Sequence, residues 1–138
     1  MRDFSITLHS LKNGWAFIKA ANDSRDKVFA ISYVGGDALS GLIDSAINSL
    51  NGYQYQTKFL LEPEEIVFAT QPDEHDKILI NMGKEVFSCT KANYARQILN
   101  FFDSYLHEQS KEEYHKQWHD EFPEQKLQTL RSIFHAQK

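Results

Sequence analysis

The sequence has little of three things: it has one cysteine, three prolines and no apolar run longer than four residues. A single cysteine, Cys89, excludes an intrachain disulfide and a zinc site built from cysteines. The short apolar runs exclude a transmembrane helix, which needs about 20 apolar residues. The first 14 residues lack the apolar core of a secretory signal peptide. We therefore expect a cytoplasmic protein.

The amino-acid composition is that of an ordinary globular domain. The 138 residues are 41% hydrophobic and 25% charged, which predicts one folded domain over residues 1–138. The 13% of aromatic residues can build a core without crosslinks. The net charge is −4, so the chain lacks the basic surface that is typical of nucleic-acid binding.

The acidic charge is concentrated in one stretch. Residues 62–85 hold seven acidic and two basic side chains, whereas 1–61 and 86–138 are nearly balanced. The seven acids are Glu62, Glu64, Glu65, Asp73, Glu74, Asp76 and Glu85. Such acids either keep turns soluble or form a surface that steers a basic partner.

Alternating apolar and polar residues predict a strand over 4–9, and two further strands are predicted over 15–20 and 27–34. Asn13-Gly14 favours a tight turn between the first two. The third strand is apolar on both faces, which is typical of a central strand. Asp37 is a suitable N-cap for an amphipathic helix over residues 38–50, with Gly41 placed for close approach to the sheet.

The middle of the chain again predicts strands, over 53–61, 66–70, 77–82 and 85–88. In the first of these, Tyr53 to Leu61 place alternate apolar side chains on one face. Short sequential strands with brief turns pair antiparallel by default. In such a meander, Glu62, Glu64 and Glu65 share one end of the sheet with Glu85, while Asp73, Glu74 and Asp76 lie at the other.

The last third predicts two to three helices. An apolar stripe from Ala92 to Leu106 follows the N-cap Thr90, Ser110 begins a capping box, and Pro123 opens the last helix. The fold class is therefore α+β: an antiparallel sheet of about seven strands, with one helix between strands 3 and 4. The C-terminal helices pack on one face of the sheet.

Motifs of known catalytic sites are absent, including GxSxG, the P-loop, GxGxxG and HExxH. His115 and His119 share a helical face with Glu112, a spacing that suits either a metal site or acid–base catalysis. Because the segment is densely polar apart from Tyr114 and Trp118, we expect the two histidines to face solvent or to flank these aromatic side chains instead. Cys89 at a helix start is either a reactive thiol or a small buried side chain. We predict no catalytic residue, metal or cofactor.

Tyr114 and Trp118 lie one helical turn apart, with Phe122 a further turn along. Such a group is typical of a core, and when exposed it is typical of a binding hot spot.

Several segments together resemble small bacterial immunity proteins of polymorphic toxin systems, of which contact-dependent growth inhibition is one. The segments are ISYVGGDALSGLIDSAINSLNG (31–52), KFLLEPEEIVFA (58–69), EVFSCTKANYARQILNFFDSYL (85–106) and EEYHKQWHDEFPEQKLQTLR (112–131). The resemblance implies a non-enzymatic, cytoplasmic protein that binds and neutralises one cognate toxin domain, either at its active site or at a distance. Many such toxins are basic, and nucleases are common among them.

The seven acids of residues 62–85 are the candidate toxin-binding residues on this interpretation. The sequence leaves two alternative functions open. One is an adaptor or chaperone-like module that offers a sheet edge or the Tyr114 and Trp118 surface to a peptide. The other is a small hydrolase that uses His115, His119 and an acid such as Glu112.

Overall fold

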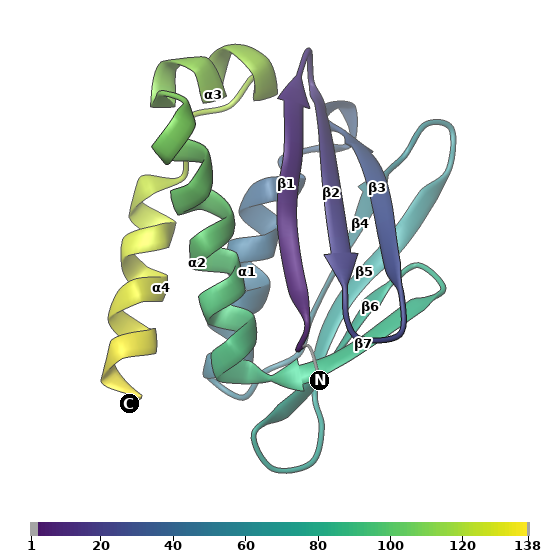
Figure 1. Ribbon diagram of the computed structural model, residues 1–138, viewed down its shortest axis with the longest axis vertical. Coiled ribbons are helices and arrows are strands. Elements are labelled where there is room, and N and C mark those ends of the chain that lie inside the picture. The colour runs from purple at the N-terminus through teal and green to yellow at the C-terminus, as the bar shows by residue number, and fades with distance from the viewer. Residues whose placement is uncertain (1–2, 138) are drawn as a thin grey trace.

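The computed structural model describes residues 3–137, in which a twisted antiparallel sheet packs against a layer of helices (Figure 1). The strands in this range are β1 (Ser5–Lys12), β2 (Trp15–Ala21), β3 (Asp26–Ser32), β4 (Tyr55–Leu60), β5 (Glu65–Pro72), β6 (Lys77–Met82) and β7 (Glu85–Thr90). The helices are η1 (Tyr33–Gly35), α1 (Ala38–Leu50), α2 (Lys91–Glu108), α3 (Lys111–Trp118) and α4 (Glu124–Ala136). This order confirms the predicted α+β fold.

The strands lie in the sheet in sequence order, and each pairs antiparallel with the next. Successive side chains of a strand point to opposite faces. In β2, Ala16 and Ile18 are therefore fully buried while Phe17 between them is 38% exposed. Asn13 and Gly14 have φ values of 52° and 82°, the left-handed conformation that the predicted tight turn requires.

The sheet is nearly divided between β3 and β4, which pair at one position, Ser32 with Leu60. The β2–β3 pairing runs along the full length of both strands, and the β4–β5 pairing runs along all of β4. The predicted strand 27–34 ends at Ser32, because the Ser32 hydroxyl accepts a hydrogen bond from Val34 N (3.1 Å) and begins η1. The prediction was wrong for Val34, which is 80% exposed, and Lys27 and Val28 are exposed as well.

The predicted helix starts are confirmed by their capping bonds. The side chains of Asp37, Thr90 and Ser110 each accept a hydrogen bond from the backbone N–H three residues later, at 3.0–3.2 Å. These bonds satisfy amides that the helix itself leaves unpaired. Pro123 precedes α4 and forms no side-chain cap bond.

Two details of the predicted faces were wrong. Tyr53 lies outside β4, in the connection after α1, and is 66% exposed. Ala92, placed in the apolar stripe of α2, is exposed, whereas Tyr94 and Phe101 are buried. The reason is that α2 packs against β1, α1 and α4 at once, so its buried face is wider than one stripe.

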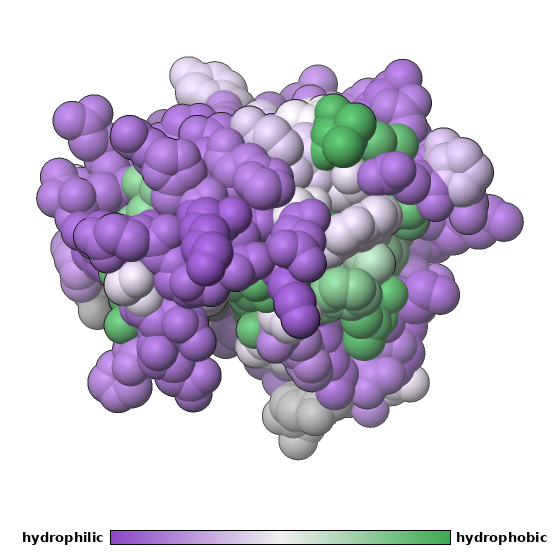
Figure 2. Space-filling model, turned by 90° about the horizontal axis from the view of Figure 1, so that it is seen from above, coloured by the Kyte–Doolittle hydropathy of each residue, from purple (hydrophilic) through white to green (hydrophobic). Residues whose placement is uncertain are grey.

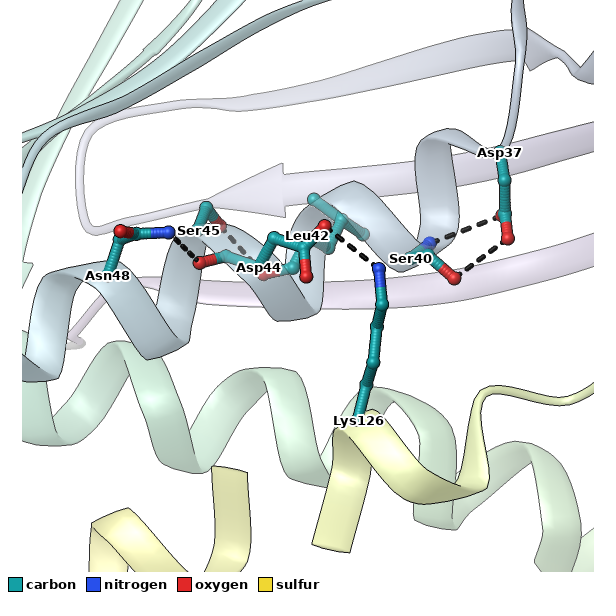
Figure 3. A network of polar contacts seen from close by, with 7 residues as sticks. All are labelled: Asp37, Ser40, Leu42, Asp44, Ser45, Asn48 and Lys126. Atoms are coloured by element: carbon teal, nitrogen blue, oxygen red, sulfur yellow. Dashed lines mark hydrogen bonds and ion pairs between the residues drawn. The ribbon is translucent and has the colours of Figure 1, made fainter. Parts of the chain in front are cut away.

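Helix α1 lies between the sheet and α4 and contacts both. Gly41 allows the close approach that was predicted, since a Cβ there would lie 3.3 Å from the Tyr55 hydroxyl on β4. Three residues further along α1, Asp44 forms an ion pair with Lys126 of α4, whose Nζ lies 3.0 Å from the carboxylate (Figure 3). These contacts fix α1 in the middle of the molecule.

Aromatic rings fill the core between the sheet and the helices. Phe59 stacks on Phe68 with ring centroids 4.7 Å apart, and Phe4 meets Phe87 at 5.3 Å. The second contact brings the two outer strands of the sheet together, because Phe4 directly precedes β1 and Phe87 lies in β7. Of the helices within residues 3–137, none has the length and apolar character needed to cross a membrane.

Candidate interaction surface

Glu62, Glu64 and Glu65 lie together at the β4–β5 turn, where all three are exposed. A short backbone hydrogen bond closes this turn, from Leu61 N to Glu64 O at 2.7 Å. Glu65 pairs with Leu60 as the first residue of β5. The fixed backbone holds the three carboxylates in one region of the surface.

Asp73, Glu74 and Asp76 lie in the β5–β6 turn, at the opposite end of the strands, and are also exposed. Two backbone hydrogen bonds shape this turn, from Asp73 N to Lys77 O (2.9 Å) and from Lys77 N to Glu74 O (3.0 Å). The antiparallel strand order confirms that these acids and the β4–β5 acids belong to different ends of the sheet. The seven acids thus do not form one patch.

Glu85, at the start of β7, differs from the other six acids. It is half-buried and forms an ion pair with Arg25 of the β2–β3 turn, with Oε1 3.6 Å from Nε. Among residues 3–137, no ion pair within 4.0 Å joins any of the other six acids to a basic side chain. The β4–β5 turn therefore carries three exposed, uncompensated carboxylates.

An exposed apolar residue that the sequence reasoning missed lies beside this turn. Val34 in η1 is 80% exposed, and its neighbour Gly35 packs so closely against Leu60 that a Cβ at Gly35 would lie 2.6 Å from the Leu60 Cβ. The Gly35-Gly36 pair after the strand was the available signal that Val34 leaves the sheet. Figure 2 views this end of the molecule and shows apolar residues on the sheet side, while the helix side is mainly hydrophilic.

The histidine pair is not assembled into a site in the described part of the chain. His115 and His119 are both exposed, and His119 lies beyond the last turn of α3 in a left-handed conformation (φ 72°). Its ring packs edge-on to Tyr33 (centroids 5.7 Å apart) rather than facing an acid. No group of three metal-ligating side chains occurs among residues 3–137.

Cys89 lies on the inner face of β7 and is 6% exposed. Burial, together with the smaller effect of the nearby Asp3 carboxylate, raises the pKa of its thiol from 9.0 to about 12. A thiol with this pKa stays protonated at neutral pH and is a poor nucleophile. Of the two interpretations of Cys89, the buried apolar side chain agrees with the structure.

Tyr114 and Trp118 are fully buried, which confirms the interpretation of this pair as core. The indole N–H of Trp118 donates to Asp37 Oδ1 at 2.8 Å, so one carboxylate caps α1 and also binds the C-terminal region. Phe122 packs edge-on to Tyr114 at 5.2 Å. This pair therefore cannot present a binding surface to a peptide in the folded protein.

Comparisons of the chain with protein-family models, with curated proteins and with solved structures found no match.

Proposed function

We propose that this chain is an immunity protein: it binds one toxin domain in the cytoplasm and neutralises it without catalysis. The proposal begins from the resemblance of residues 31–52, 58–69, 85–106 and 112–131 to such proteins. The strongest structural support is the β4–β5 turn. Its three acids, Glu62, Glu64 and Glu65, are exposed and have no ion-pair partner among the described residues, and the exposed Val34 lies beside the turn.

Physical chemistry explains why such a surface suits a tight protein partner. Exposed carboxylates steer a basic protein toward the surface and raise the rate of association. An apolar residue at the centre of a contact loses its exposed area to the partner and contributes hydrophobic free energy. The toxin would accordingly carry lysine or arginine residues around an apolar contact, as a basic nuclease domain can.

Co-expression is the test of this proposal. A toxin gene directly upstream, with a variable C-terminal domain, identifies the candidate partner. Cells that produce that toxin domain should grow when they also produce this protein, and the two proteins should copurify. Failure of this protein to restore growth, although it is folded and abundant, contradicts the proposal.

A second candidate function is an adaptor that accepts an extended peptide at a sheet edge. The observation that favours it is the single pairing position between β3 and β4, which leaves most of β3 with a strand neighbour on one side only. Exposed strand edges accept further strands through their main-chain groups. An adaptor would bind several partners weakly, so one tight partner in a pulldown contradicts it.

A further inference from the structure

The two halves of the sheet, β1–β3 and β4–β7, are joined through strand pairing at one end of β3 only. At that end Ser32 pairs with Leu60, and the described residues 26–31 of β3 have no pairing position on β4. At the other end of β3, the twist of the sheet brings the β2–β3 turn next to β7 (Figure 1). At this second end, the contacts between the described residues of the turn and β7 are made by a side chain.

Arg25 in the β2–β3 turn makes three contacts with β7. Its guanidinium donates a hydrogen bond to the Val86 backbone oxygen, forms the ion pair with Glu85, and lies over the Phe87 ring with Cζ 4.8 Å from the centroid. Phe87 is 1% exposed and belongs to the core. One side chain thus binds three successive residues of an outer strand.

The turn itself orients Arg25 toward β7. The Asn22 side-chain oxygen accepts hydrogen bonds from Ser24 N (3.0 Å) and Arg25 N (3.2 Å), and Asn22 N donates to Arg25 O (2.9 Å). These bonds fix the backbone on both sides of the Arg25 Cα. A planar guanidinium can stack on a ring and donate at its edge at the same time, which a lysine ammonium cannot do.

We propose that Arg25 is a clasp: it fastens the β2–β3 hairpin to β7 and so keeps the weakly paired junction between β3 and β4 closed. Release of Arg25 lets the hairpin move away from β7, which uncovers Phe87 and loosens β3. The clasp controls local opening of the sheet, and it is independent of the partner proposed above. Local opening of this kind is a known mode of motion in folded proteins.

Hydrogen–deuterium exchange with mass spectrometry tests the clasp on the full chain. In Arg25→Ala, amides of β3 and β7 should exchange about tenfold faster than in the unmodified protein, since a hydrogen bond and a cation–π contact are lost. Amides of α2 and β5 should be unchanged. The matched control is Lys19→Ala, which removes the exposed Lys19–Asp26 ion pair (3.4 Å) of the same hairpin without touching β7.

Each outcome of this experiment either supports the clasp or overturns it. Faster exchange confined to β3 and β7 in Arg25→Ala, and absent in Lys19→Ala, supports the clasp. Unchanged exchange, or an equal increase across all elements, overturns it. If Arg25→Ala does not fold, Arg25→Lys and Glu85→Gln are measured instead. Arg25→Lys should then show the local increase, with a smaller one in Glu85→Gln, and no local increase in either overturns the proposal.

Discussion

At the scale of single residues, buried and half-buried polar side chains decide how the helices meet. Asp37 caps α1 and accepts from the Ser40 hydroxyl at 2.7 Å (Figure 3). It also accepts the Trp118 indole N–H. Tyr94 is fully buried and shares a 2.7 Å hydrogen bond with the Ser45 hydroxyl, which ties α2 to α1. A buried polar group without such a partner costs free energy, so these bonds select one packing of the helices.

Trp118→Phe should lower the free energy of unfolding by at least about 1–3 kcal/mol, because it removes the hydrogen bond to the Asp37 carboxylate and also one of the two fused rings of a fully buried side chain. Urea unfolding followed by circular dichroism measures this loss. Tyr105→Phe is a suitable control, since Tyr105 is only half-buried and its ring contact with Tyr114 is retained. A loss below about 0.5 kcal/mol in Trp118→Phe would mean that the indole bond contributes little to stability.

Alkaline pH should destabilise the protein in part through Cys89. Its pKa is about 12 in the folded state against 9.0 for an unperturbed thiol, so the folded protein holds this proton more tightly than the unfolded chain does. The resulting stability is fully present below pH 9 and is lost as the pH rises from about 9 to about 12. Burial also raises the pKa values of Tyr94 and Tyr114, which adds to the same loss.

Thermal unfolding of the unmodified protein and of Cys89→Ala between pH 7 and pH 11 tests this contribution. The variant should be less stable at pH 7, where it loses buried contacts, and its unfolding temperature should then fall less steeply above pH 9. Parallel curves for the two proteins would show that the thiol does not contribute to the pH dependence.

At the scale of elements, caps and apolar faces explain where helices begin and how they pack. Helix α2 is the longest helix of the described chain, and it covers β1 while also contacting α1 and α4. Its fully buried Phe102 meets Phe101 at 5.0 Å and Phe122 at 6.0 Å between ring centroids. The contact with Phe122 places the segment between α3 and α4 against α2.

Phe102→Ala should cost about 3–5 kcal/mol of unfolding free energy, because it leaves a cavity among aromatic rings that cannot collapse easily. Asn100→Ala, at an exposed position of the same helix, is the control and should change stability by less than about 0.5 kcal/mol. Chemical denaturation measures both variants. A cost under about 1 kcal/mol for Phe102→Ala is incompatible with the packing described for α2.

At the scale of the whole molecule, the sheet separates the acidic charge into two groups. The β4–β5 and β5–β6 turns lie at opposite ends of antiparallel strands, and Glu85 forms an ion pair with Arg25. A charged surface that steers a partner acts over about 10 Å at ordinary ionic strength. Either group can therefore steer a partner on its own, and only the β4–β5 group lies beside Val34.

Charge reversal can tell the two groups apart. Glu64→Lys with Glu65→Lys should slow association with the proposed basic toxin about tenfold at low salt and weaken the salt dependence. Asp73→Lys with Glu74→Lys changes the net charge equally at the other end and should slow association less. Stopped-flow binding at several salt concentrations measures this, and stability should change by less than about 0.5 kcal/mol in both variants. Equal effects of the two variants would argue that only the overall charge matters.

The sequence by itself determined the element order, because the underlying signals are local. The alternation of apolar and polar residues predicted the strands. Asp37, Thr90 and Ser110 predicted the starts of three helices, because a cap acts within the first turn and does not depend on what the helix packs against. Antiparallel pairing of neighbouring strands followed from short turns, and with it the separation of the β4–β5 acids from the β5–β6 acids.

Only the tertiary structure decided the features that depend on residues far apart in sequence. The exposure of Val34 depends on the end of β3 at Ser32 and on the packing of Gly35 against Leu60. The bond from Trp118 to Asp37 and the contacts of Arg25 with β7 join residues more than 50 positions apart. No local pattern encodes such contacts, because they arise from the twist of the sheet and from the way the helices share one core.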